Sequence, residues 1–91
     1  MSMILFITLS PHKAKLEIRD NEICIDSTEF SIDGDLAHHL LLEIDNLLFR
    51  KGLKKEELFD IHLEMKEVGS TTERIAQSVV NTFYFTKSSL V

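Results

Sequence analysis

The sequence predicts a small mixed α/β (α+β) domain in the order β-β-β-α-β-α, with two helices packed on a mixed sheet of about four strands. A continuous apolar segment opens the chain, and two segments of alternating apolar and polar residues follow it. Two segments with apolar residues at helical spacing, separated by one more alternating segment, complete the order. We therefore expect a single domain over residues 1–91.

The first three strands are expected to form an antiparallel meander. Residues 3–9 are continuously apolar, which is typical of a strand buried on both faces. Residues 13–19 alternate strictly, and the Asp20-Asn21 pair that follows is a hairpin signal. Residues 22–27 then predict a short third strand through Ile23 and Ile25.

The strongest helical segment is residues 32–52. Asp33 or Asp35 can cap its N-terminus, and Gly52 supplies the stop. Seven apolar residues form one stripe at 3.6-residue spacing, which we expect to cover the sheet: Leu36, Ala37, Leu40, Leu41, Ile44, Leu47 and Leu48.

Leu42 and Phe49 lie outside this stripe, on an adjoining flank with Asp45 between them. The flank is either the margin of a wide core stripe or a second surface for a partner. A chain of 91 residues builds only a marginal core, so an oligomeric partner is expected on size alone.

A fourth strand and a second helix end the pattern. Residues 58–66 alternate, which predicts a strand with one wet face. Ser70 and Glu73 fit a capping box, and the helix that follows should end near Thr86. Its apolar stripe is Ile75, Ala76, Val79, Val80 and Phe83. The first and fourth strands can lie parallel, with the helices on one face of the sheet or divided between both.

The composition disfavours several classes of function. Ten basic residues against fifteen acidic ones give a net charge of −5, which argues against direct nucleic-acid binding. A single cysteine, Cys24, forms no internal disulfide and fits a reducing compartment. The apolar opening segment lacks a basic leader and is too short to span a bilayer, so we expect a cytoplasmic protein without membrane contact.

No catalytic or metal-binding set can be assembled from the spacing. His38 and His39 point about 100° apart on a helix and cannot easily share one ion. Asp33 and Asp35 flank a glycine as in a calcium loop, but the positions that follow are apolar, so helix capping explains them better. We expect no catalysis by this chain alone, no metal and no cofactor.

Several local sequences follow the motif order of one protein family. Residues 7–10, ITLS, stand at the end of the first strand, and His38-His39 precede the Leu-rich segment 40–48. GLKKEELFDIHL and VGSTTERIAQSV follow, at residues 52–63 and 68–79. In this order they resemble the I-D-T-S, H-S, G-L-x-x-x-D-L-D and G-P-G-S-[FY]-T-G-[LV]-R motifs of the N-terminal half of the TsaB/YeaZ family. These proteins have an actin-like (RNase H-like) fold and assist threonylcarbamoyladenosine formation on tRNA. The resemblance covers about residues 3–85.

The resemblance also implies a phosphate-binding loop, which is degenerate here. Its positions are Thr8, Ser10, Gly69 and Ser70. Actin-like sites need a carboxylate at the end of the first strand for the magnesium of a nucleotide, and this chain has Thr8 there. Glu67 and Glu73 add negative charge where a phosphate would sit. The capping box therefore explains Ser70 and Glu73 better than a nucleotide does, although a free helix N-terminus can attract an anion.

Family members are themselves non-catalytic: they stabilise the related TsaD protein by packing helices against its helices. The resemblance therefore implies a non-enzymatic interaction protein with a TsaD-like partner. Two alternatives are a homodimer that uses the same helices without a role on tRNA, and a small actin-like nucleotide-binding protein. From helical phase, the predicted interface residues are Leu42, Asp45 and Phe49 on the first helix and Gln77, Val80 and Tyr84 on the second.

Overall fold

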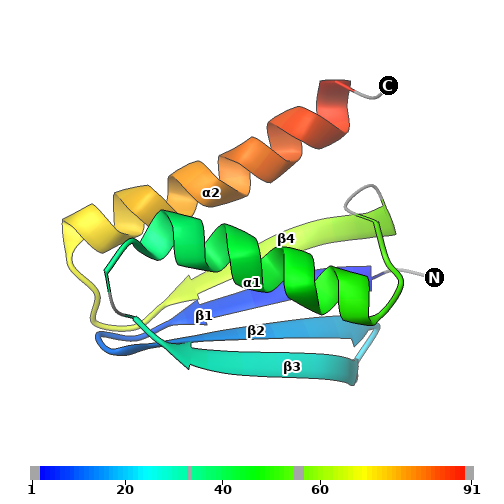
Figure 1. The fold of residues 1–91 in the computed structure, drawn as a ribbon, viewed down its shortest axis with the longest axis horizontal. Helices are drawn as coiled ribbons and strands as arrows, with labels where there is room; N and C mark the ends of the chain where they lie inside the picture. Colours follow the sequence, from blue (N-terminus) through cyan, green and yellow to red (C-terminus); the bar gives the residue numbers. More distant parts are fainter. Residues whose placement is uncertain (1–2, 33, 55–56, 90–91) are drawn as a thin grey trace.

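The computed structural model describes residues 3–32, 34–54 and 57–89. The elements are β1 (Met3–Leu9), β2 (Lys13–Asp20), β3 (Ile23–Ser31), α1 (Leu36–Arg50), β4 (Leu58–Met65) and α2 (Ser70–Ser89). The strands form one sheet in the order β3-β2-β1-β4 (Figure 1). The first three are antiparallel, and β4 pairs parallel with β1 through the crossover that carries α1. The predicted fold class, element order and parallel pairing are confirmed.

Both helices lie on the same face of the sheet (Figure 1). The side chains that β1 and β2 direct toward the helices are completely or almost completely buried: Leu5, Ile7, Leu9, Ala14, Leu16 and Ile18. No helix of the described chain covers the other face, where Ile4, Phe6 and Thr8 are half-buried. The prediction that β1 is buried on both faces was therefore wrong, and the wet face of β4 lies on the open side.

Helix α1 has the ends that the sequence predicts. Asp35 is the N-cap, and its Oδ1 accepts a hydrogen bond from the backbone N–H of His38 at 3.2 Å. Gly52 follows the helix with φ of 67°, a left-handed conformation that glycine adopts without steric cost. Asp33 lies outside the described residues. The predicted stripe faces the sheet, with Leu36, Leu40, Ile44, Leu47 and Leu48 buried.

The main differences from the predicted element boundaries lie in β3 and α2. Strand β3 continues to Ser31 rather than Ser27, because Thr28 and Phe30 pair with Leu16 and Ala14 and extend the hairpin along most of β2. Helix α2 ends at Ser89 rather than near Thr86. It also begins with Ser70 as a helical residue, and the N–H of Glu73 donates to the carbonyl of Gly69 at 3.0 Å. Gly69 thus occupies the capping position that the capping box assigns to Ser70.

Neither described helix combines the length and apolar character that a membrane span requires.

Candidate partner-binding surface

One side of α1 carries large apolar side chains that the fold leaves exposed. Phe49 is 87% exposed and Leu42 is 48% exposed, while their neighbours Leu40, Ile44 and Leu48 are buried under the helix. Asp45 is exposed between them. We refer to Leu42, Asp45 and Phe49 as the α1 flank. The wide core stripe is wrong for these residues, because it would have buried Phe49, and a partner surface stays a prediction.

Of the residues predicted on α2, Val80 does not lie on an exposed surface. Gln77 is exposed and donates from Nε2 to Oδ1 of Asn81 at 3.2 Å. Val80 is only 3% exposed and belongs to the core with Ala76 and Val79, because α2 packs against α1 and β4 through this face. Val80 is therefore a core residue of this chain rather than part of an exposed flank. The side chain of Tyr84 lies outside the described residues.

The degenerate phosphate-loop positions lie at one end of the sheet. Thr8 and Ser10 stand at the end of β1, and the N–H of Lys66 at the end of β4 donates to the carbonyl of Leu9 at 2.8 Å. The hydroxyl and the N–H of Ser10 both bond the carbonyl of Lys13, at 3.1 and 2.9 Å.

The charges near this end are unfavourable for a phosphate. Thr8 pairs across the sheet with Glu64, whose carboxylate would repel a phosphate on this side. Glu67, before α2, and Glu73, in its first turn, are exposed and close in sequence to Gly69 and Ser70. Both donors of Ser10 are engaged within the chain, and the carboxylates nearby disfavour an anion.

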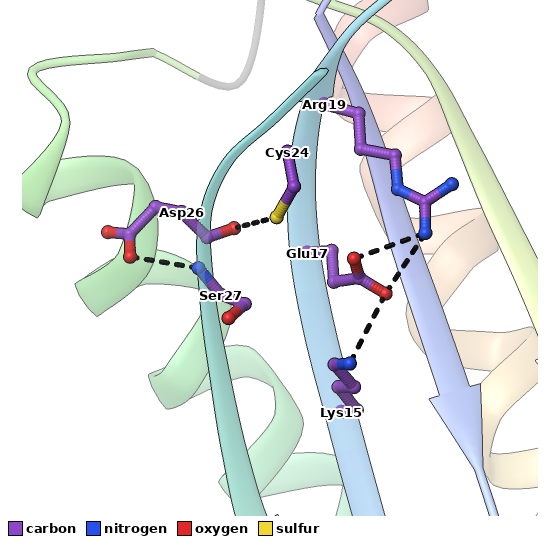
Figure 2. A network of polar contacts seen from close by, with 6 residues as sticks. All are labelled: Lys15, Glu17, Arg19, Cys24, Asp26 and Ser27. Atoms are coloured by element: carbon purple, nitrogen blue, oxygen red, sulfur yellow. Dashed lines mark hydrogen bonds and ion pairs between the residues drawn. The ribbon is translucent and has the colours of Figure 1, made fainter. Parts of the chain in front are cut away.

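The polar contacts of the structure lie mainly on β2 and β3. Arg19 donates from Nη2 to both carboxylate oxygens of Glu17, at 3.3 and 3.1 Å, and Nζ of Lys15 is 3.8 Å from Oε1 (Figure 2). Burial acts to raise the pKa of Glu17, but the hydrogen bond from Arg19 and the charges of Arg19 and Lys15 bring it below the ordinary value of 4.5. Glu17 is therefore ionised at neutral pH.

The exposed thiol of Cys24 lies beside this network and donates to the carbonyl of Asp26 at 3.6 Å (Figure 2). Neighbouring Ser27 donates its N–H to Oδ1 of Asp26 at 2.8 Å.

The histidines do not gather into a metal centre. Among the described residues, no group of three or more His, Cys, Asp or Glu side chains is placed to hold a metal ion. Nε2 of His39 instead lies 4.0 Å from Oε1 of Glu43, one helical turn away. The ring of His39 also contacts the ring of Phe30, with centroids 4.3 Å apart. The Phe30 contact was not predicted, because the sequence pattern ended the third strand before this residue.

The comparisons with known proteins identify the fold. YeaZ from Pseudomonas aeruginosa superposes with a TM-score of 0.81 and 23% identity, over 97% of this chain and 41% of that one. The fold is that of part of YeaZ. A second solved structure, described as a protein with similarity to peptidase YeaZ from Pseudomonas aeruginosa, gives a TM-score of 0.82 with 23% identity over 97% of this chain and 40% of that one.

The chain thus spans about 40% of the length of these YeaZ-fold structures. No protein-family model and no functionally curated protein matches the sequence.

Proposed function

We propose that this chain is a non-catalytic, TsaB-like interaction protein that pairs through the α1 flank with a TsaD-like protein in threonylcarbamoyladenosine modification of tRNA. The choice of a TsaD-like protein as the partner is supported by the YeaZ fold and by the resemblance of the local sequences. The observation that carries the proposal is the 87% exposure of Phe49, a large aromatic side chain on α1.

The chemistry of the α1 flank fits a protein partner. Leu42 and Phe49 lie two helical turns apart on one side, so a partner helix can cover both at once. Aromatic side chains that become buried in an interface commonly dominate its binding energy. Asp45 between them adds one exposed charge to this side.

The test is size-exclusion chromatography with light scattering, first on the pure chain and then on a mixture with the TsaD protein of the same organism. We expect a stoichiometric complex with the native chain. Phe49→Asp should weaken it about thirtyfold or more, since it removes an anchor and adds a charge.

Ile23→Asp is the matched control, because it places the same charge at another exposed apolar residue, 70% exposed on β3. This variant should bind TsaD as the native chain does. A native chain that ignores TsaD, or a Phe49→Asp chain that binds it unchanged, would refute the proposal.

A further inference from the structure

The open face of the sheet carries an ordered pattern of charge. Across the strands, three rows of paired residues point to this face: Lys15, Thr8 and Glu64; Glu17, Phe6 and His62; and Arg19, Ile4 and Asp60. The ring of Phe6 lies 5.0 Å from that of His62, and the guanidinium of Arg19 lies 4.3 Å above the Phe6 ring. These contacts confirm that the side chains of neighbouring strands share the face.

The three strands present side chains of different charge and polarity on this face. On β2, basic Lys15 and Arg19 flank Glu17 and both form ion pairs with it, and on β4, Asp60 and Glu64 are acidic. Between them, β1 presents Ile4 and Phe6 as an apolar ridge, half-buried and without a helix over it. The face therefore has a basic side and an acidic side, separated by an apolar centre.

From this pattern we propose that the open sheet face binds a second copy of this chain, stacked face to face about a twofold axis that runs along β1. Rotation by half a turn about this axis exchanges the two sides, so β1 meets β1 and each β2 meets the partner's β4. The strands of the two sheets then run in similar directions, as in aligned sheet packing.

In this arrangement every row is complementary to itself. Lys15 meets Glu64 of the second copy, Arg19 meets Asp60, and Glu17 meets His62, while Ile4 packs on its own counterpart. The Phe6 ring keeps its contact with the Arg19 guanidinium of its own chain beside the axis. An axis across the strands would instead place β2 on β2 and bring like charges together. The charge pattern thus selects both the occupant and its orientation.

The other charges of this face are compatible with the same arrangement. Lys13 and Glu29, toward the β3 edge, form an ion pair at 3.6 Å within one chain and balance each other. Glu17 forms ion pairs with Arg19 and Lys15 within one chain, which leaves one net positive charge on these three β2 side chains for a second copy to meet. The surface is separate from the α1 flank, since both helices cover the opposite face, so this inference does not rest on the proposed function.

Charge reversal provides the test. Lys15→Glu and Glu64→Lys should each weaken the dimer roughly tenfold at low ionic strength, because symmetry repeats the repulsive contact twice. In an equimolar mixture, the heterodimer of the two variants restores both contacts. The two reversed side chains face each other in one contact, and the other contact joins the native Lys15 to the native Glu64. Sedimentation equilibrium should therefore show recovery of the native dimer affinity in the mixture.

The controls separate folding from association. Lys54→Glu makes the same lysine-to-glutamate change outside the sheet, in the segment that follows α1. This variant should leave the dimer affinity unchanged. Circular dichroism checks that each variant is folded, and the neutral pair Lys15→Gln and Glu64→Gln replaces the reversals if either one unfolds.

Three outcomes would overturn the inference. The first is a native chain that stays monomeric up to about 100 µM at low salt, where ionic contacts are least screened. The second is a mixture of charge-reversal variants that shows no recovery. The third is a dimer that Phe49→Asp dissociates while Lys15→Glu does not, which would place self-association on the α1 flank.

Discussion

Arg50, the last residue of α1, donates a hydrogen bond from Nε to Oδ2 of Asp26 on β3 at 2.7 Å. Its Nη2 donates to the carbonyl of Ser27 at 3.2 Å, so one guanidinium joins the end of the helix to the outermost strand of the meander. The hydrogen bond from Arg50 lowers the pKa of Asp26 below its ordinary value of 3.8. The contact therefore has a predictable dependence on pH.

Asp26→Asn should destabilise the chain more at neutral pH than in acid. A carboxyl whose pKa is lower in the folded than in the unfolded state stabilises the fold above the unfolded pKa, and this contribution is lost as pH falls through the folded value. Urea unfolding of the variant and the native chain at about pH 6 and about pH 2.5 should thus show the larger difference at the higher pH. Glu22→Gln, at the exposed β2–β3 turn, serves as the control. An equal difference at both pH values would contradict the prediction.

Leu40 and Leu42 are two residues apart on α1 and should respond differently to truncation. Leu40 is completely buried against the sheet, so Leu40→Ala should lower the free energy of unfolding by about 2–5 kcal/mol. Leu42 is 48% exposed, and Leu42→Ala should cost less than about 1 kcal/mol. Denaturant unfolding measures both, and similar losses would mean that the helix is rotated from its described position.

Gly52 should tolerate asparagine better than alanine. Its φ of 67° is strained for a residue with a Cβ, although no heavy atom beyond its chain neighbours lies within 4 Å of the position that a Cβ would take. The cost is therefore conformational, and Gly52→Ala should lose roughly 1 kcal/mol of stability. Asparagine adopts the left-handed region more readily, so Gly52→Asn should lose less. Thermal unfolding of the two variants tests whether the asparagine variant is the more stable one. A clash with neighbouring atoms would instead penalise the larger asparagine more than alanine.

Asp35 should contribute to stability as a helix cap. Asp35→Ala removes the acceptor for the N–H of His38 and should cost about 1 kcal/mol. Asp35→Ser keeps a capping oxygen and should retain most of the stability. Equal unfolding midpoints for the alanine variant and the native chain would show that the cap is dispensable.

The elements of the fold were predictable because their signals are local. The alternation of residues 13–19 and the helical spacing from Leu36 to Leu48 each follow from one repeating geometry. The open face was harder to predict from β1, because an apolar run does not reveal which of its two sides a helix covers. Ile4 and Phe6 are as apolar as Leu5 and Ile7, yet only the latter pair lies under the helices.

The candidate interface was predictable in part, for a related reason. Helical phase separates Leu42 and Phe49 from the stripe of α1, since that stripe is long and well defined. On α2, the orientation depends on how the helix packs against both α1 and β4, which phase alone does not specify. Val80 is in the core for this reason. Ile23, predicted within a strand, is 70% exposed, because it begins β3 at the edge of the sheet.

The parallel pairing of β1 with β4 has a consequence for the order in which the chain folds. The strands of the meander β1–β2–β3 are joined by short turns. In contrast, Ile7 on β1 pairs with Leu63 on β4, and β2, β3 and α1 lie between them in sequence. Closing so long a loop costs entropy before any contact compensates it, so the meander with α1 should form first, and β4 with α2 should dock last. Hydrogen exchange in the native state should then release the amides of β4 before those that join β1 to β2. The strand that supplies Asp60 and Glu64 would be the last to assemble and the first to detach.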